Sequence, residues 1–334
     1  MSALSIAVTG GIGAGKSTLS GALADRGAVL VDSDVLAREV VRPGTPGLAA
    51  ISQAFGDGVI GGDAGLDRAA LAEIIFADPA ARRTLEGITH PLVRRRYAEL
   101  LAAAPQNAIV VNDIPLIRDL QVAAGFHLVI GVGVQHEELR LRRLIARGLA
   151  EKDARSRIAA QISDTDRRPL CDVWLDNSAQ VGDLLAAVDP LWRRLTEFAG
   201  NRVARRPAQQ QGRVLAEPDP RRRDLAVLLA ARVSQSVGGG RVDHVGSTAI
   251  EGFPAENVID LQLTVASLEQ AEQFAPALAA AGFPGAPSWD SPHPDGAQPS
   301  RKWLHGSADP GQIVNLHVRV RDSPAWAARS GWAP

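Results

Sequence analysis

The sequence predicts an α/β fold with a parallel sheet in the first 200 residues and a smaller second domain after them. Five short apolar runs rich in Val and Ile alternate with longer amphipathic segments, and each run is bounded by Gly, Asp or Asn. Strands that alternate with helices favour a parallel sheet covered on both faces. The predicted strands are residues 5–10, 28–34, 108–114, 127–134 and 173–178.

The longer segments between these strands predict helices. Residues 79–104 read as one long helix or as a broken pair, because Pro91 follows His90 in the middle of the pattern and lacks a backbone N–H. Residues 136–163 predict two charged helices, and Gly148 is typical of the end of the first one. We therefore expect a helical layer around the sheet.

Composition and charge limit the classes of protein and partner. The chain has 334 residues, of which 46% are hydrophobic, so two domains with sizeable cores are expected. Lys and Arg total 36 against 37 Asp and Glu, which argues against a general nucleic-acid binder. The only cysteine, Cys171, excludes an intrachain disulfide and a thiolate zinc site.

The sequence also shows no recognisable signal peptide or membrane-spanning segment. The opening residues lack the basic n-region of a signal peptide, and no uncharged apolar run approaches the length of a membrane span. Together with the single cysteine, this predicts a soluble cytoplasmic protein that binds neither a membrane nor nucleic acid. The sequence leaves the oligomeric state open.

A glycine-rich stretch near the start of the chain, "VTGGIGAGKSTLSGAL", carries the strongest local motif. Residues 10–17 fit the pattern G-x-x-x-x-G-K-[ST], with a predicted strand before it and a predicted helix after it. In this context backbone N–H groups surround the β-phosphate, Lys16 reaches the β- and γ-phosphates, and Ser17 ligates magnesium. A chance match in a turn is disfavoured because strand, loop and helix are in register. The residues predicted to contact the nucleotide here are Gly11, Gly13, Ala14, Gly15, Lys16, Ser17 and Thr18.

Carboxylates follow the next predicted strand. Asp32 and Asp34 in "VLVDSDVLAREV" lie at its carboxyl end, the edge of an open α/β sheet where ligands bind. A carboxylate there accepts a hydroxyl proton, orients an acceptor oxygen or holds magnesium through water. A carboxylate at this position is also a common N-cap of the following helix, and the spacing does not favour either interpretation. Asp113, at the end of another strand, is a further candidate magnesium carboxylate.

Six segments together are more specific than the phosphate loop. In chain order they are "TGGIGAGKST", "VDSDVLAREVV", "ITHPLVRRR", "DIPLI", "RIAAQISD" and "DVWLDNS", across about the first 200 residues. In this order they resemble the dephospho-coenzyme A kinase family. The resemblance implies a P-loop NTPase kinase domain with a parallel five-stranded sheet, a helical acceptor-binding region and a mobile helical lid. It also implies ATP- and Mg²⁺-dependent phosphorylation of the ribose 3′-hydroxyl of dephospho-coenzyme A, the last step of coenzyme A biosynthesis.

The resemblance assigns chemical roles residue by residue. Asp34 matches the carboxylate that acts on the acceptor hydroxyl, while Lys16 and Ser17 match the nucleotide and magnesium residues. Arg143 and Arg147 match basic positions of the lid, although their spacing alone favours a solvated helix face. The predicted catalytic residues are thus Asp34, Lys16, Arg147 and Arg143, with Ser17 as the metal ligand.

Other matches concern substrate binding. Asn177 falls in the "DN" associated with the adenine end of ATP. For His90, a structural histidine at a helix kink is as good an interpretation as an acceptor contact. The residues matched to the acceptor side are Asp34, Arg38, His90, Ile114, Pro115 and Leu116. The chain departs from the family at Arg118 and Asp119, where a glutamate is usual, and the family does not require Asp113.

The composition changes between residues 201 and 223. This stretch carries seven arginines and a triple glutamine with few large apolar residues, and it predicts a linker. For its arginines we favour a solvated, flexible tether over a nucleic-acid arm. The predicted organisation is a kinase domain at 1–200, a basic linker at 201–223 and a second domain at 224–334.

Alternating side chains predict two strands in the second domain, at 258–265 and 312–321. On the latter strand, one face is expected to carry Val314, Leu316, Val318 and Val320, and the other Asn315, His317, Arg319 and Arg321. Residues 284–300 hold five prolines and predict a loop.

The string "VDHVGSTAIEGF" before "VIDLQLTV" resembles the GrpB-like domain, an α+β relative of nucleotidyltransferases. Gly246, Ser247 and Asp260 match, but Gln262 stands where a second metal carboxylate is expected. We therefore predict a degenerate domain that is not a competent transferase and serves folding, regulation or assembly. The resemblance ends near residue 321, which predicts an incomplete C-terminal part.

Two other functions are kept as alternatives. Another small-molecule P-loop kinase, of the nucleoside monophosphate or shikimate type, is disfavoured by the "HP" and "DIPL" segments. In a nucleotide-binding regulatory or scaffold protein, ATP would bind without turnover and Asp34 would be a helix cap. The enzyme and binding interpretations therefore differ in whether Asp34 is available to an acceptor.

Overall fold

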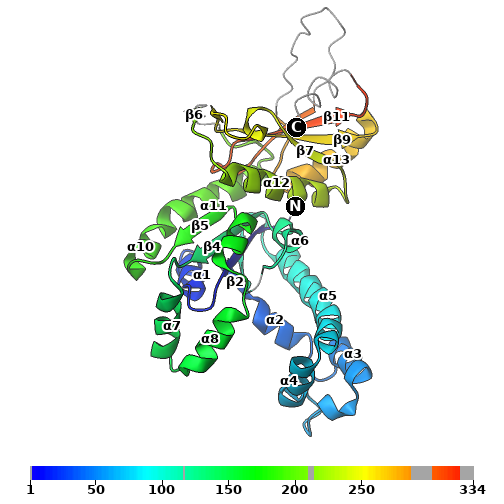
Figure 1. Ribbon diagram of the computed structural model, residues 1–334. Helices are drawn as coiled ribbons and strands as arrows, with labels where there is room; N and C mark the ends of the chain where they lie inside the picture. Colours follow the sequence, from blue (N-terminus) through cyan, green and yellow to red (C-terminus); the bar gives the residue numbers. More distant parts are fainter. Residues whose placement is uncertain (1, 116, 210–213, 287–302, 324–334) are drawn as a thin grey trace, which may run out of the picture.

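Five parallel strands form the sheet of the first half of the chain, in the order β2-β3-β1-β4-β5 (Figure 1). Their bounds are β1 (Leu4–Gly10), β2 (Val29–Asp32), β3 (Ile109–Asp113), β4 (Leu128–Gly133) and β5 (Val173–Asp176). The strand order and direction confirm the predicted parallel sheet. The computed structural model describes residues 2–115, 117–209, 214–286 and 303–323.

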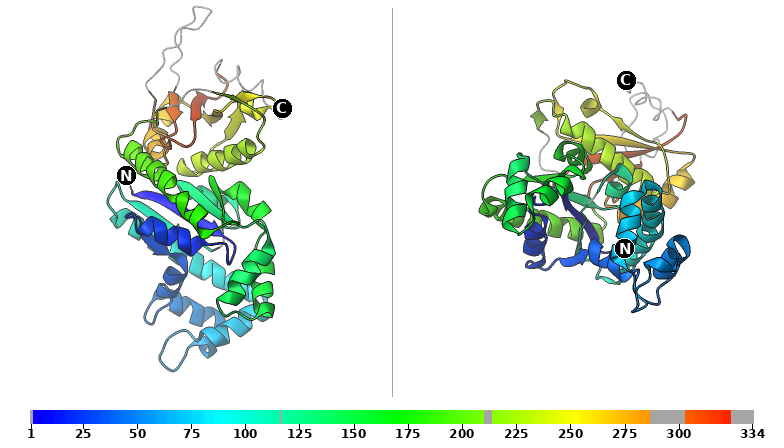
Figure 2. Two further views of the ribbon diagram at one scale, coloured as in Figure 1. Left: turned by 90° about the vertical axis from the view of Figure 1, so that its left-hand side faces the viewer. Right: turned by 60° about the horizontal axis from the view of Figure 1, so that its bottom comes forward.

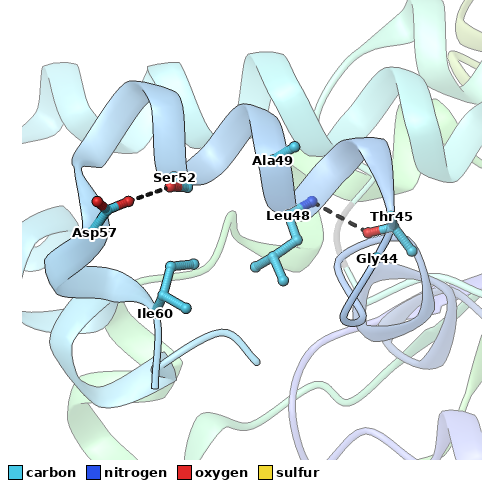
Figure 3. A pocket seen from close by; sticks show the side chains of 7 residues that line it. All are labelled: Gly44, Thr45, Leu48, Ala49, Ser52, Asp57 and Ile60. Atoms are coloured by element: carbon cyan, nitrogen blue, oxygen red, sulfur yellow. Dashed lines mark hydrogen bonds between the residues drawn. The ribbon is translucent and has the colours of Figure 1, made fainter. Parts of the chain in front are cut away.

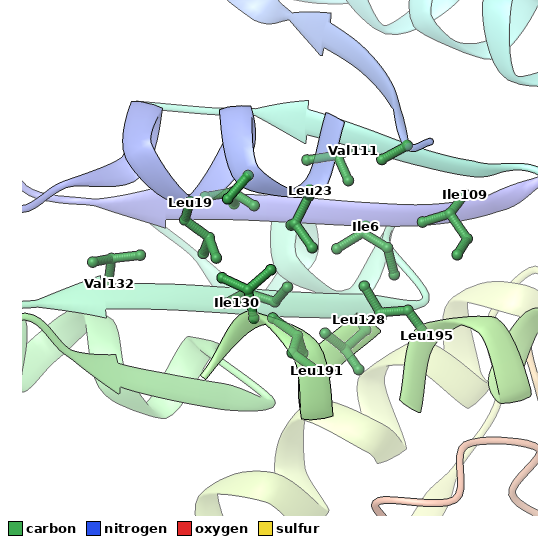
Figure 4. Close-up of a cluster of buried hydrophobic side chains, with 14 of the residues drawn as sticks. Ile6, Leu19, Leu23, Ile109, Val111, Leu128, Ile130, Val132, Leu191 and Leu195 are labelled. Carbon is green, nitrogen blue, oxygen red and sulfur yellow. The ribbon is translucent and has the colours of Figure 1, made fainter. Parts of the chain in front are cut away.

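Helices cover both faces of this sheet. Their bounds are α1 (Lys16–Ala24), α6 (Leu120–Ala124), α10 (Val181–Ala186) and α11 (Val188–Val203). Leu23 of α1 and Leu195 of α11 are fully buried with Ile6 of β1 in one cluster (Figure 4). Ala7 and Val129 belong to a second cluster that includes side chains of α6. Burying one leucine stabilises the fold by about 1.5–3 kcal/mol, so these contacts hold α1 and the loop before it in place.

A helical arm follows β2. It consists of α2 (Ser33–Glu39), α3 (Pro46–Phe55), the short 3₁₀ turn η1 (Asp57–Val59), α4 (Arg68–Ala77) and α5 (Pro79–Ala103). α5 is one continuous helix that runs through Pro91, so the long-helix interpretation holds and the expected break does not occur. The hydrogen bond that proline removes is outweighed because α2, α3 and α4 pack along α5.

A second group of helices follows β4. It consists of α7 (Glu137–Ala146), α8 (Glu151–Ala159), α9 (Asp164–Arg167) and the 3₁₀ turn η2 (Arg168–Leu170). Gly148, with a φ angle of +90°, lies between α7 and α8, as the sequence predicts. Figures 1 and 2 show α7, α8 and the helical arm at the end of the molecule away from the second sheet.

The second half of the chain forms a four-stranded mixed sheet in the order β10-β11-β9-β7. Its elements are β6 (Leu215–Ala216), α12 (Arg221–Ser236), β7 (Val242–Val245), η3 (Ser247–Ala249), β8 (Ala255–Glu256), β9 (Ile259–Val265), α13 (Leu268–Ala280), β10 (Trp303–Gly306) and β11 (Val314–Val320). Val314, Leu316 and Val318 lie in its core, which confirms the predicted alternation. The opposite face is not simply solvated, because His317 and Arg319 are also buried.

The two halves meet at the amino ends of the strands of the five-stranded sheet, where α12 lies between the two sheets (Figure 1). α11 continues to Val203, inside the predicted linker. The expectation of a solvated tether is wrong for Arg202, which is 1% exposed and donates to Ala280 O at 2.7 Å. Its guanidinium joins the two halves because it docks against the end of α13. The expectations for residues 287–300 and 324–334 fall outside the described residues.

Charged side chains are buried in this interface. Arg232 of α12 pairs with Asp172 at 2.8 Å, and Arg194 of α11 pairs with Asp309 at 2.6 Å. Both pairs connect residues that are far apart in sequence, so they specify how the halves dock. Across the parts of the chain described above, no helix is both long and apolar enough to cross a membrane.

Candidate active site

The phosphate loop joins β1 to α1, and its backbone depends on glycine. Gly13 and Gly15 have φ angles of +79° and +110°, in the left-handed region. A Cβ atom on Gly15 would lie 2.3 Å from Nδ2 of Asn177, so contact excludes a side chain there as well. Because α1 begins at Lys16, the unpaired N–H groups of its first turn face the loop.

Lys16 is half-buried at this loop, and its ammonium donates to Gly10 O at 2.9 Å. Burial lowers the pKa of Lys16, and the negative charge of Asp113 opposes part of that shift. Arg167 and Arg140 lie near enough to lower the pKa of Lys16 further. Three cations are therefore concentrated where the motif places a polyphosphate.

Arginines of α7 contact the backbone of the phosphate loop. Arg140 is buried, and its Nε donates to Ile12 O at 3.0 Å. Arg143, one turn later, donates to Gly13 O at 3.4 Å and to Asn177 O at 2.9 Å. The lid helix is thus tied to the loop through guanidinium groups that also lie close to the nucleotide motif.

The arginines predicted from the sequence are only part of this cluster. Arg140, Arg143 and Arg147 are spaced i, i+3 and i+7, so helical periodicity is a signal that could have added Arg140 to the predicted set. Arg147, in contrast, is exposed at the end of α7. Arg167 is fully buried and pairs with Asp164. No local pattern in the sequence marks Arg167, because its burial depends on how α9 packs.

Two amides complete the support of the loop. Oε1 of Gln161 accepts from Ile12 N at 2.8 Å and from Nη2 of Arg140 at 3.1 Å, a role that the sequence did not reveal. Asn177 is buried, and its Nδ2 donates to Ala14 O at 2.7 Å. Its amide group thus holds the phosphate loop, while the predicted contact with adenine stays a prediction.

The carboxylates at the end of β2 have different surroundings. Oδ1 of Asp32 accepts from the N–H groups of Asp34 and Val35 at 2.7 and 3.2 Å and so caps α2. The carboxylate of Asp34 is exposed in the first turn of the same helix. It lies near enough to the loop for its charge to raise the pKa of Lys16. The capping interpretation therefore applies to Asp32 and leaves Asp34 accessible to a ligand.

The other residues predicted for the acceptor come from the arm and from the end of β3. Arg38 in the last turn of α2 and His90 in α5 are both exposed. Ile114 and Pro115 directly follow β3 and are half-buried. Leu116 lies outside the described residues. These side chains come from separate segments that surround the strand ends, and their contacts with an acceptor stay predictions.

One hollow lies on the arm rather than at the loop. It has a volume of about 610 Å³ and is lined by α3 and the turn after it, including Thr45, Leu48 and Asp57 (Figure 3). None of the site residues predicted from the sequence lines it. In the described ranges, no group of three or more His, Cys, Asp or Glu side chains is arranged to hold a metal ion.

A parallel sheet whose first strand runs into this loop, with a basic lid beside it, defines the class of P-loop nucleotide-binding phosphotransferases. The family model described as dephospho-CoA kinase matches residues 4–183, and the one described as GrpB protein matches residues 214–331. The chain belongs to the dephospho-CoA kinase family.

Curated relatives agree with this assignment. The dephospho-CoA kinase of Mycolicibacterium paratuberculosis is 46% identical over 342 residues, which covers 96% of this chain and 84% of that protein. The Mycobacterium leprae enzyme of the same name is 44% identical over 345 residues, with the same coverage. The Streptomyces avermitilis enzyme is 44% identical over 59% of this chain and 96% of its own length. The predicted dephospho-CoA kinase function, and with it the use of ATP, is thereby confirmed.

Proposed function

We propose that the carboxyl end of the five-stranded sheet transfers the γ-phosphoryl group of ATP to the 3′-hydroxyl of dephospho-CoA, with Asp34 as the base. One observation carries this proposal. Asp32 takes the capping role in α2, so the carboxylate of Asp34 is exposed beside a strand end and within the electrostatic reach of Lys16. Asp34 accepts the proton of the 3′-hydroxyl as the hydroxyl oxygen bonds to the γ-phosphorus. The bond between that phosphorus and the oxygen bridging to the β-phosphate breaks, and ADP leaves with the electron pair.

The nucleotide side of the site is electrostatic. Backbone N–H groups of the phosphate loop and of the first turn of α1 bind the β-phosphate, and Lys16 binds the β- and γ-phosphates. Arg143 turns from loop carbonyls toward the transferred phosphoryl group, where it stabilises the developing charge. Arg147 is assigned a secondary part, because it is exposed at the end of α7. Asn177, directly after β5, lies at the adenine end of ATP, and its side-chain amide holds the backbone of Ala14.

Magnesium fits the donor set of this site. Ser17 presents an exposed hydroxyl oxygen in the first turn of α1, and oxygen is the donor that Mg²⁺ prefers. Mg²⁺ is commonly held by one or two protein groups together with phosphate oxygens and water, which agrees with the lack of an all-protein cluster among the described residues. When bound, the ion neutralises charge on the β- and γ-phosphates.

The acceptor binds on the arm side of the strand ends. Arg38 and His90 offer exposed polar groups from α2 and α5, and Ile114 and Pro115 supply apolar contacts after β3. Arg38 is a suitable partner for a phosphate of dephospho-CoA because a guanidinium binds phosphate in a bidentate manner. We place the activity in the cytoplasm, where a chain with a single buried thiol stays reduced.

The test of Asp34 is a substitution that keeps its shape. We expect Asp34→Asn to lower kcat roughly a hundredfold to ten-thousandfold, which is the usual contribution of a general base, while the Kd for ATP stays within about twofold. The measurement is ADP release with ATP, magnesium and dephospho-CoA, beside calorimetric ATP binding.

The matched control is Asp32→Asn, which removes the same charge from the same helix turn and retains a good capping residue. If Asp34→Asn and Asp32→Asn reduce kcat equally, the assignment of Asp34 as the base is wrong. If the unsubstituted protein binds ATP but does not release ADP faster with dephospho-CoA, the binding-protein alternative replaces the enzyme.

A further inference from the structure

The peptide groups on either side of Ile12, in the phosphate loop, are held by two side chains from the lid. Ile12 N donates to Oε1 of Gln161 at 2.8 Å, and Ile12 O accepts from Nε of Arg140 at 3.0 Å. Nη2 of Arg140 donates to the same Oε1 of Gln161 at 3.1 Å, so the three residues form a closed ring of hydrogen bonds. The side chain of Ile12 packs against an apolar cluster of α7 and α8, namely Leu141, Leu144, Ala154 and Ile158. The lid therefore docks on the loop at this one residue.

Arg140 comes this close to the loop because residue 11 is a glycine. A Cβ atom on Gly11 would lie 2.5 Å from Nη2 of Arg140 and 2.6 Å from its Cζ. Gly11 does not have a positive φ angle, so the backbone conformation alone does not require glycine here. The guanidinium of Arg140 thus lies directly against the backbone that surrounds the phosphates.

The charge of Arg140 is buried without being neutralised. Arg140 is 7% exposed, and within the described ranges of the chain it forms no ion pair. Burial lowers the pKa of Lys16 and of Arg167, and the charge of Arg140 adds to both effects. A buried cation that is held only by neutral oxygen atoms is costly until an anion arrives, and it keeps most of its field for that anion.

We propose that Gln161 is a positioning residue for the binding of the ATP phosphates. Its amide oxygen fixes the loop at Ile12 and directs Arg140 toward the phosphates without neutralising the arginine. This inference deepens the proposed function and rests on it. An apolar residue at position 161 would leave N–H groups of Ile12 and Arg140 without their acceptor. A glutamate would accept both hydrogen bonds but would place a negative charge beside Arg140.

The experiment measures ATP binding and folding stability of the full chain for two substitutions. For Gln161→Leu, we expect the Kd for ATP with Mg²⁺ to rise roughly 5–50-fold, because two donors lose their acceptor. For Gln161→Glu, we expect that Kd to rise about tenfold, since the new carboxylate offsets the charge of Arg140. The midpoint of urea unfolding without nucleotide should not fall in Gln161→Glu, because the carboxylate relieves repulsion between buried cations. Weaker binding by a protein that is no less stable separates positioning from a merely structural role.

A double substitution tests whether Gln161 acts through Arg140. Adding Gln161→Leu to Arg140→Met should raise the Kd for ATP by a smaller factor than Gln161→Leu does alone, because the partner that it directs is already gone. The matched control is Gln53→Leu, at an exposed position of α3, which should leave ATP binding unchanged.

Three results would overturn the proposal. The first is ATP binding by Gln161→Leu or Gln161→Glu that is no weaker than in Gln53→Leu. The second is a full, independent effect of Gln161→Leu in the Arg140→Met protein. The third is a loss of ATP affinity in both variants that only follows a loss of folding stability. Failure of the unsubstituted protein to bind ATP would instead count against the proposed function.

Discussion

The two ends of the five-stranded sheet both bring charged side chains into the interior, but they partner them differently. At the amino end, the side chain of Asp172 is 1% exposed and accepts from Val129 N and from both terminal nitrogens of Arg232. At the carboxyl end, Lys16 and Arg143 donate to backbone carbonyls. Asp172 and Arg232 thus match opposite charges, as Asp164 and Arg167 do at the carboxyl end. Lys16 and Arg143 are held on neutral carbonyls instead, as Arg202 is at the amino end.

This difference separates docking from ligand binding. A buried charge that has a fixed opposite partner is costly to disturb, because removal of one member leaves the other uncompensated. A cation held only by carbonyl oxygens keeps most of its field for an incoming anion. Substitutions at the amino end are therefore expected to lower stability, and substitutions at the carboxyl end to lower activity.

The largest effect is expected at the amino end. Arg232→Met keeps the length of the side chain but leaves Asp172 buried without its cation. We expect the free energy of unfolding to fall by about 3–5 kcal/mol, the usual cost of breaking a buried pair. The measurement is urea unfolding, beside kcat at a temperature where the variant is folded, which we expect to stay within about threefold.

Arg223→Met is the matched control for this prediction, because Arg223 lies on the same helix and pairs with Glu251 on the surface. Loss of an exposed pair costs at most about 1 kcal/mol. Equal losses of stability in Arg232→Met and Arg223→Met would mean that the docking interface does not depend on its buried charges.

The carboxyl end gives the converse prediction. Lys16→Met is expected to reduce kcat/KM roughly a hundredfold to a thousandfold, as for the loss of one group that stabilises transition-state charge. Its free energy of unfolding should not fall, because burial already disfavours the ammonium, as the lowered pKa of Lys16 indicates. The control is Lys152→Met on the exposed surface of α8. A loss of stability as large as that of Arg232→Met would remove the distinction between the two ends.

The sequence predicts best what is local. Residues 10–17 could be interpreted because strand, loop and helix follow one another directly, and the structure contains them in that order. The alternation of Val314, Leu316 and Val318 predicted a buried face for the same reason. α5 shows the limit of local rules, since packing along its length keeps it continuous through Pro91.

What the sequence could not predict depends on contacts between distant segments. Arg167 is fully buried beside Asp164, whose Oδ2 accepts from Val134 N just after β4. The residues next to Arg167 in the sequence do not indicate this burial. Asp113 lies beside Asp32 because β3 pairs with β2, and the order of strands in the sheet cannot be predicted from the local sequence. Asp172 and Arg232 are 60 residues apart, so their pairing is a product of domain docking. We predicted that Arg202 belongs to a solvated tether, because its contact with Ala280 O forms only when the two halves of the chain dock.

The smallest predicted effect is a pH dependence that arises at the amino end. Nδ1 of His127 accepts from Ser5 N at 3.0 Å, so its Nε2 carries the proton and donates to Ala280 O at 2.9 Å. Burial, aided by the charge of Arg202, lowers the pKa of His127 well below its ordinary value of 6.5. In the unfolded chain the imidazole binds a proton near its ordinary pKa, whereas in the folded chain it does not until the pH is much lower. This contribution to stability is therefore complete above about pH 6.5 and is lost as the pH falls, by at most about 1.4 kcal/mol per pH unit.

His127→Gln should remove that part of the pH dependence, because glutamine cannot take up the proton. The measurement is the free energy of unfolding between about pH 8 and about pH 5, where the variant should show a shallower slope than the unsubstituted protein. His244 and His305 also have lowered pKa values from burial, so a residual slope of the same sign is expected in the variant. His136→Gln, at an exposed position, is the control. An unchanged slope in His127→Gln would show that the imidazole takes up its proton in the folded protein without cost, and the prediction would then be wrong.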